Sequence, residues 1–339
     1  MGFRIMTEGL ALMSAPRHEF ESVMATGLSL RLRRFGTGLL CYSPTGYPYS
    51  IRDHSQVDPY AFVSASVTGT SCSLMCDHCR GRYLTGMRPA TTPDALLKLA
   101  EEVQSRGGQG LLVSGGSDSA GQVPLKRVGH ALSKIRNEMG LKVVVHTGIV
   151  DVETADMLSD AQVDAAMLDV IGDERVAREV YHLHDGPARM AESLKLLSER
   201  GVPTVPHVLV GLDYGRLSGE LAALQTVADC RPSAVVVIVL SPIRKTPMAN
   251  VTPPSPEAVG RVLTVARLAM QDVPILLGCA RPLGEHKIQS DEYAVRSGVN
   301  GIAYVSQRGV DVARELGLVP QFMDVCCSLA PLHVYPPKI

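Results

Sequence analysis

The chain has 339 residues, of which 45% are hydrophobic, and its 33 basic and 34 acidic residues give a formal net charge of −1. This near-neutral mixture of signs lacks the basic stripe of a nucleic-acid-binding protein, and the longest purely apolar run, Ala234–Leu240, is far too short to span a bilayer. Eight cysteines are too few for a disulfide scaffold of this length. With no signal-peptide pattern at Met1, we expect a cytoplasmic protein without a nucleic-acid or membrane partner.

The first 59 residues are expected to form an N-terminal extension. A helix is predicted over His18–Arg34. It is followed by a stretch rich in Gly, Pro and Tyr, Phe35–Ile51, that fits no regular pattern. The main domain is therefore expected to begin at residue 60.

From residue 60 onward, short β-branched runs alternate with amphipathic segments of helical length, which is typical of parallel strands joined by crossover helices. The predicted strands are Ala61–Val67, Gly110–Val113, Lys142–Val145, Ala165–Leu168, Thr204–Leu209, Ala234–Leu240, Ile275–Leu277 and Gly301–Val305. The predicted helices include Pro93–Arg106, Leu125–Met139, Pro187–Arg200, Leu217–Asp229, Pro256–Met270 and Asp291–Ser297. Eight strand–helix units predict an α/β protein with a closed, TIM-like (β/α)8 barrel over residues 60–316 and a short C-terminal tail over 317–339.

Three cysteines gather directly after the first predicted strand, where a barrel places its chemistry. Cys72, Cys76 and Cys79 are separated by three and two residues. Thiolates are the usual ligands of iron–sulfur clusters, and this loop can wrap three of them around one face of a cubane. Because the next cysteine, Cys230, is remote, one iron would remain open to a ligand from outside the chain.

A structural zinc site is the alternative, with His78 or a remote residue completing a Cys₃His set. Three ordinary buried thiols are a further alternative. Zinc sites usually pair two ligand knuckles, and no second knuckle is visible in the sequence. The spacing therefore favours an iron–sulfur cluster.

The Cys-x₃-Cys-x₂-Cys loop after a strand resembles the signature of the radical S-adenosylmethionine (SAM) superfamily. The resemblance implies a 4Fe-4S cluster on Cys72, Cys76 and Cys79, with SAM bound at the open iron and cleaved to a 5′-deoxyadenosyl radical. His78 stands where family members usually carry an aromatic residue. A low-potential reductant, a ferredoxin or flavodoxin, is implied as well.

Other strand ends resemble further parts of the superfamily's SAM site. Gly115, Gly116 and Ser117 follow the second strand and resemble its Gly-Gly-Glu loop, although a tight turn would explain two glycines equally well. His146 and Asp169 end the third and fourth strands, where a role as capping residues is the alternative. His207 opens a segment similar to the one that flanks the adenine. The resemblance implies SAM contacts for His78, Gly115, Gly116, Ser117, His146, Asp169, His207 and Arg281.

Four further thiols are candidates for an auxiliary iron–sulfur cluster. Cys279 and Arg281 follow the seventh strand, Cys326 and Cys327 lie in the tail, and Cys41 lies in the extension. Biotin synthase and lipoyl synthase use such a cluster as a sulfur donor, but their ligand spacings are absent here. Inert buried thiols are the alternative for the cysteines, and a salt bridge is the alternative for Arg281.

Two segments resemble the biotin synthase and lipoyl synthase group: Val239–Met248, at the end of the sixth predicted strand, and the Gly-Cys-Ala-Arg-Pro run at Gly278–Pro282. The overall pattern resembles a subunit of the two-protein lipoyl synthase. That resemblance implies sulfur insertion into an octanoyl chain on a lipoyl carrier protein, together with a second radical SAM subunit. The alternatives are a radical SAM enzyme that rearranges or fragments a small molecule, and a zinc-stabilised barrel without catalysis.

Overall fold

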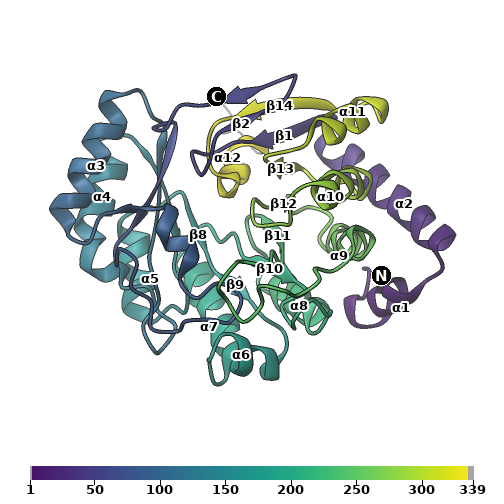
Figure 1. Cartoon of the computed structure of the whole chain (residues 1–339), viewed down its shortest axis with the longest axis horizontal. Coiled ribbons are helices and arrows are strands. Elements are labelled where there is room, and N and C mark those ends of the chain that lie inside the picture. Colours follow the sequence, from purple (N-terminus) through teal and green to yellow (C-terminus); the bar gives the residue numbers. More distant parts are fainter. Residues whose placement is uncertain (1, 335–339) are drawn as a thin grey trace.

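The computed structural model describes residues 2–334 and shows strands that curve around a central space, with helices on the outside (Figure 1). The strands are β1 (Gly38–Tyr42), β2 (Tyr49–Ser50), β3 (Ser55–Gln56), β4 (Phe62–Ser66), β5 (Arg88–Pro89), β6 (Gly110–Ser114), β7 (Lys142–His146), β8 (Ala165–Met167), β9 (Asp169–Val170), β10 (His207–Val210), β11 (Val235–Val239), β12 (Ile275–Leu277), β13 (Gly301–Ala303) and β14 (Val319–Met323).

The α-helices are α1 (Leu10–Ser14), α2 (Arg17–Phe35), α3 (Pro93–Ser105), α4 (Gly129–Asn137), α5 (Val152–Asp160), α6 (Glu174–Val180), α7 (Gly186–Glu199), α8 (Glu220–Asp229), α9 (Pro256–Ala269), α10 (Glu285–Arg296), α11 (Gln307–Glu315) and α12 (Ala330–Val334). A π-helix, η1 (Ile5–Gly9), and the 3₁₀-helices η2 (Arg82–Gly86), η3 (Leu125–Val128) and η4 (Cys327–Leu329) complete the elements. None of the helices within residues 2–334 is long and apolar enough to cross a membrane.

The eight predicted strands are present, and the TIM-like α/β fold is confirmed. Together with β1, β5 and β14, which were not predicted, they form parallel ladders in the order β5-β4-β6-β7-β8 and β9-β10-β11-β12-β13-β1-β14. Leu168 separates β8 from β9, which together form the predicted fourth strand. A closed barrel was predicted, in which every strand pairs with two neighbours. Among residues 2–334, however, β5 and β14 each pair with only one neighbour, so the ring of hydrogen-bonded strands is open between them.

Both terminal regions contribute to the same sheet. Strand β1 comes from the predicted N-terminal extension and lies between β13 and β14, with Cys41 opposite both Ile302 and Phe322. Strand β14 comes from the predicted C-terminal tail. Residues on both sides of the predicted barrel boundaries therefore build its wall.

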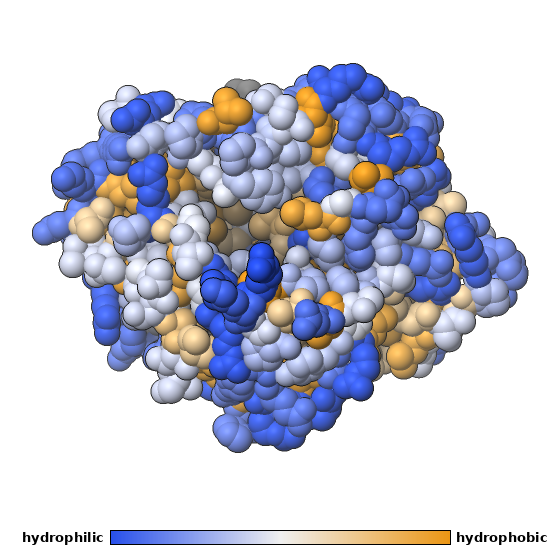
Figure 2. Space-filling view, in the orientation of Figure 1, coloured by the Kyte–Doolittle hydropathy of each residue, from blue (hydrophilic) through white to orange (hydrophobic). Residues whose placement is uncertain are grey.

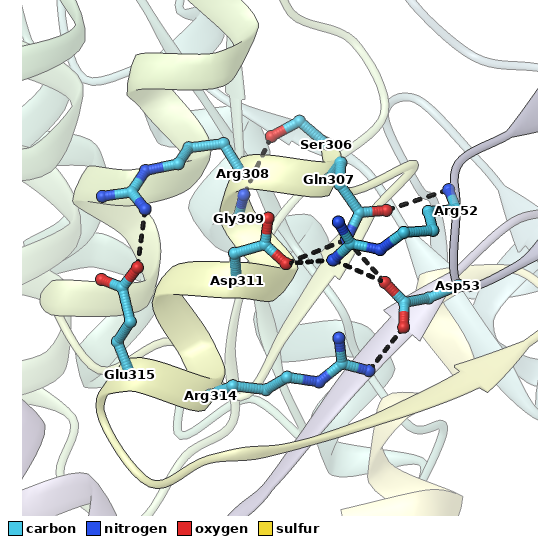
Figure 3. A network of polar contacts seen from close by, with 9 residues as sticks. All are labelled: Arg52, Asp53, Ser306, Gln307, Arg308, Gly309, Asp311, Arg314 and Glu315. Carbon is cyan, nitrogen blue, oxygen red and sulfur yellow. Dashed lines mark hydrogen bonds and ion pairs between the residues drawn. The ribbon is translucent and has the colours of Figure 1, made fainter.

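A polar network attaches the turn between β2 and β3 to helix α11 (Figure 3). Asp53 pairs with Arg314 at 2.6 Å, and Arg52 pairs with Asp311 at 2.7 Å. Gln307 donates to Asp53 and to Asp311. The contacts of Arg52 and Asp53 join residues more than 250 positions apart and hold the β2–β3 turn against α11.

Apolar side chains on alternate strand positions fill the lower part of the central space, which we call the lumen. Val144, Ala165 and Val205 belong to this inner core, whereas Val143, Val145 and Ala166, next to the first two in sequence, belong to the outer core. The chain after β14 also enters this core with Val325 and Leu329. Figure 2 shows that the viewed face is hollowed near its centre, where Figure 1 shows the space that the strands surround.

A buried ion pair joins the loop after β12 to helix α10. Arg281 donates to Asp291 at 2.8 Å, and both side chains are at most 1% exposed. Asp291 also accepts a hydrogen bond from the backbone N–H of Ser306 at 2.6 Å. Removal of one partner would leave an uncompensated buried charge.

We predict that Asp291→Ala lowers the free energy of unfolding by about 3–5 kcal/mol because Arg281 would remain buried and unpaired. Anaerobic urea denaturation followed by circular dichroism measures this change. Glu292→Ala is the matched control on the same helix, since Glu292 pairs with Arg296 at 3.0 Å in a partly exposed position and should contribute less than about 1 kcal/mol. Equal losses in the two variants would contradict the prediction.

Candidate functional site

The predicted cluster loop lies where expected, between β4 and η2. It reverses direction through left-handed residues, with φ of 46° at Met75, 47° at Arg80 and 70° at Gly81. The backbone N–H groups of Cys79 and Arg80 both donate to the carbonyl of Cys76, at 3.1 and 2.8 Å. These turns bring all three thiols against one apolar cluster, in which Cys76 is buried.

The loop after β6 packs directly against the first cysteine. A Cβ atom at Gly116 would lie 2.0 Å from the carbonyl oxygen of Ser71 and 2.6 Å from Cα of Cys72, so only glycine fits this position. The backbone of Ser73 donates to the carbonyl of Ser117 at 2.7 Å. The predicted Gly115-Gly116-Ser117 loop is therefore adjacent to the cluster loop.

Thr68 closes this contact from the other side. Its hydroxyl accepts a hydrogen bond from the backbone N–H of Gly116 at 2.7 Å, and it also lies against Gly115. The end of β4 and the end of β6 are thus held together through their loops.

A second set of contacts holds the middle of the cluster loop and was not predicted. The backbone N–H of Asp77 donates a hydrogen bond to the carbonyl of Val180. Nδ1 of His182 lies 2.6 Å from the carbonyl oxygen of Leu74. The hydroxyl of Tyr214 donates to the Asp77 carboxylate at 2.6 Å. No sequence motif indicated these contacts, and the rare left-handed φ of His182, 58°, is visible only in the structure.

His78 lies beside the thiols and stacks on an aromatic ring. Its ring centroid is 5.0 Å from that of Tyr181, with 19° between the planes. Its Nδ1 atom is buried without a hydrogen-bond partner in the chain. The hydrogen bond from the Cys76 thiol, together with His78, lowers the pKa of Cys79, which favours the thiolate that binds metal.

The spacing of the thiols fits a cluster better than a single zinc ion. With Zn–S bonds of about 2.3 Å in a tetrahedral site, ligand sulfurs would be roughly 3.8 Å apart. Within residues 2–334, the only trio of His, Cys, Asp or Glu ligand atoms within 4.8 Å of one another is His146, Asp169 and His207. At least one pair of the Cys72, Cys76 and Cys79 sulfurs is therefore more than 4.8 Å apart, so the three are not gathered as the ligands of one zinc ion would be.

His146, Asp169 and His207 converge in the lumen from β7, β9 and β10. Nε2 of His146 is 3.5 Å from Oδ1 of Asp169, and Nδ1 of His207 is 3.7 Å from the same oxygen. The hydroxyl of Tyr181 donates to the other carboxylate oxygen at 2.7 Å. Burial opposes ionisation of Asp169, but the two imidazoles outweigh it and hold the pKa of this carboxyl well below its usual range.

Three of the four additional thiols lie within electrostatic range of one another. Cys326 and Cys327 are buried in the inner core, and each is close enough to Cys279 for their charges to interact. Cys279 is reached by solvent, although the atoms crowded around it and nearby Cys326 raise the pKa of its thiol. Within this group, the hydrogen bond from Cys327 lowers the pKa of Cys326.

Cys41 does not join these thiols, contrary to the prediction. Its strand neighbours Leu40 and Tyr42 belong to the inner core with Cys326 and Cys327, whereas Cys41 packs in the outer core. Successive side chains of a strand point to opposite faces, so Cys41 lies on the far side of the wall. Three thiols, not four, remain as candidates for an auxiliary cluster.

Arg281 is also placed differently from its predicted contact with SAM. Its guanidinium donates to Gly278, Asp291 and Tyr304, and the side chain is buried. The salt bridge that was the alternative prediction is present, and it engages the arginine in the wall.

Residues 66–214 match the model of the radical SAM superfamily. Among curated proteins, the chain is 24% identical over 275 residues to a biotin synthase of Acetivibrio thermocellus, covering 78% of this chain and 82% of the relative. It is 25% identical over 209 residues to a biotin synthase of Leptospira biflexa, covering 58% of this chain and 57% of that relative.

Two solved structures share the fold. Methylornithine synthase (PylB) aligns with a TM-score of 0.66 at 13% identity, covering 99% of this chain and 97% of that one. The FeFe-hydrogenase maturase HydG from Carboxydothermus hydrogenoformans aligns with a TM-score of 0.64 at 14% identity, covering 95% of this chain and 76% of that one. The matched region contains the whole three-cysteine loop and the glycine loop packed against it, and residues 66–214 form a radical SAM domain.

Proposed function

We propose that this radical SAM enzyme inserts sulfur into an octanoyl chain on a lipoyl carrier protein, in lipoate biosynthesis, together with a second radical SAM subunit. The observation that carries the proposal is the gathering of Cys279, Cys326 and Cys327 at the lumen. Similarity to biotin synthases, which insert sulfur, supports the same class of reaction.

A cluster held by this loop would, with bound SAM, supply the chemistry that breaks an unactivated C–H bond. The chain's own residues hold these groups: Cys72, Cys76 and Cys79 provide the thiolates. Gly115 and Gly116 carry no side chain, so their backbone packs against Thr68, Ser71 and Cys72, next to the thiolates where SAM would bind. Thr68 fixes the orientation of this backbone through its hydrogen bond to Gly116.

Apolar residues around the cluster loop exclude water from the reacting groups. Leu74, Ile149, Ile171 and Met248 are at most 7% exposed and pack in one cluster with Cys76. A dry site of this kind suits both a reactive radical and an aliphatic substrate chain. An octanoyl chain is such a substrate.

Sulfur insertion also requires a source of sulfur, and Cys279, Cys326 and Cys327, which we call the lumen thiols, are suited to hold one. We assign an auxiliary iron–sulfur cluster to Cys279, Cys326 and Cys327. A partner ferredoxin or flavodoxin would supply the low-potential electron.

The contact at Gly116 gives a direct test of the SAM-binding site. We predict that Gly116→Ala lowers bound iron and SAM cleavage at least about tenfold, because the new Cβ would collide with the backbone at Ser71 and Cys72. Gly86→Ala is the matched control, since nothing lies within 4 Å of a Cβ there. Iron content and 5′-deoxyadenosine yield measure both variants, and wild-type values for Gly116→Ala would contradict the assignment.

The lumen thiols are tested by counting iron. We predict about eight irons in the reconstituted wild type and about four in Cys279→Ala, from two four-iron clusters and one. Cys279→Ala should still cleave SAM but form no sulfur-containing product from an octanoylated carrier protein in the presence of its partner.

Cys41→Ala is the matched control because its thiol lies on the other face of the wall, and it should retain all of its iron. Mössbauer spectra of both variants distinguish the two clusters. About four irons in the wild type would contradict the auxiliary cluster and favour rearrangement or fragmentation of a small molecule.

A further inference from the structure

Three loops that follow strands β4, β10 and β11 pack against one another beside the lumen. They are residues 72–86, 211–219 and 241–255, and we call them the rim loops. Leu74, Leu212 and Met248, one from each loop, are buried in the same apolar cluster. A Cβ atom at Gly215 would lie 2.1 Å from the carbonyl oxygen of Thr252, so the second and third loops touch through their backbones. The rim loops therefore form one continuous surface.

Tyr83 places this surface at the entrance of the lumen. Its ring centroid is 6.4 Å from that of His78, and the ring is 49% exposed. The pKa of its hydroxyl is raised by burial and, in addition, by the charges of Cys79, Cys279 and Asp169. These three groups lie on different parts of the lumen wall, so the hydroxyl points into the space between them while the ring borders solvent. A substrate that enters the lumen from this side passes the rim loops.

The rim loops carry an excess of positive charge. Their five basic residues are Arg80, Arg82, Arg216, Arg244 and Lys245, and their two acidic residues are Asp77 and Asp213. Both carboxylates are buried and already paired, Asp77 with Arg80 at 2.7 Å and Asp213 with Arg175 at 2.8 Å. The acidic side chains are therefore not available to the remaining cations.

Three of the rim cations have no acidic partner. Arg82, Arg244 and Lys245 are exposed, and none of them forms an ion pair with another residue of the described part of the chain. Lys245 also has a left-handed backbone, with φ of 64°, which is uncommon for a residue other than glycine. Figure 2 shows strongly hydrophilic side chains beside the hollow of the viewed face. Unpaired surface charge of one sign attracts and steers a partner of the opposite sign.

Exposed aromatic and apolar side chains stand among these cations. Met75, Tyr83, Tyr214 and Leu217 are each at least 40% exposed. The ring of Tyr214 is held in place by the hydrogen bond from its hydroxyl to Asp77. Tyr, Met and Arg are enriched in protein interfaces, and a tyrosine that is already fixed loses little entropy on binding. This composition is typical of a surface that docks another protein.

We propose that the rim loops dock an acidic protein domain that carries the octanoyl chain on a flexible arm. The inference rests on the proposed function and adds the surface and the charge by which the carrier is recognised. Unpaired cations favour an acidic partner, and the position of Tyr83 beside the lumen lets a docked carrier pass its arm inward. An electron donor is a weaker fit because only an electron has to reach the cluster, so such a protein need not cover the lumen entrance.

Binding of an octanoylated lipoyl carrier protein with an acidic surface to the reconstituted holoenzyme tests the docking surface. Arg244→Glu/Lys245→Glu should raise the Kd at least about tenfold, because like charges would then face each other across the interface. Wild-type binding should weaken between about 0.1 and 1 M salt, since the Debye length falls from about 10 to 3 Å. Anaerobic isothermal titration calorimetry measures both effects.

Arg33→Glu/Lys98→Glu is the matched control, with the same change in net charge. Both residues are exposed, on α2 and α3, and neither forms an ion pair within residues 2–334. Figure 1 shows these helices on the outside of the strands. The control should bind the carrier like the wild type. Both double variants should keep their cluster iron and their SAM cleavage with a chemical reductant, which shows that they have folded.

Three results would overturn the proposal. The first is an unchanged Kd in Arg244→Glu/Lys245→Glu. The second is an equal loss in the control, which would assign the effect to the net charge of the whole protein. The third is a wild type that does not bind the carrier, and binding of an acidic flavodoxin through the same cations would then assign the rim loops to an electron donor.

The docking surface and the proposed reaction fail separately. Carrier binding that depends on Arg244 and Lys245, without sulfur insertion in the presence of the partner subunit, would support the docking surface and contradict the proposed reaction. Sulfur insertion with an unchanged Kd in the double variant would have the opposite meaning.

Discussion

The contact between Gly116 and the backbone at Ser71 and Cys72 is the constraint on which the site depends. Strands β4 and β6 pair in parallel as far as Ser66 and Ser114, so the two following loops leave the sheet at the same level. The absence of a Cβ atom at Gly116 lets those loops pack directly against each other. The thiolates and the backbone assigned to SAM binding are then positioned by the sheet itself, whose rigid strands hold a site more precisely than a free loop would.

Local patterns predicted most of this region because its order in sequence matches its order in space. The cysteine spacing, the strand before it and the glycine pair after the next strand are each readable within a few residues. The eight strands were found in the same way, from short β-branched runs between amphipathic helices. Strand β1 was missed because Phe35–Ile51 contains several turn-forming residues, and its partners β13 and β14 lie more than 250 residues away.

The errors at Cys41 and Arg281 have one physical origin. Both residues lie in or directly after a strand of the wall, so the sequence alone allows either of them to face the lumen. The direction of each side chain depends on the strand register and on its interaction partners. Cys41 is one residue from Tyr42, and that single step moves its thiol from the lumen to the helical layer. Arg281 follows strand β12 as predicted, yet buried Asp291 on α10 attracts its charge away from the lumen.

Tyr181 connects the two halves of the site. Its ring stacks on His78 beside the cluster thiols, and its backbone carbonyl is 3.9 Å from the sulfur of Cys76. Its hydroxyl, at the other end of the side chain, binds Asp169. A buried tyrosine has few rotamers in a close-packed core, so the position of the Asp169 carboxylate is fixed relative to the cluster loop. Tyr181 therefore fixes the spacing between the cluster loop and the polar groups of the lumen, and positioning of this kind is what holds two reacting groups at a productive distance.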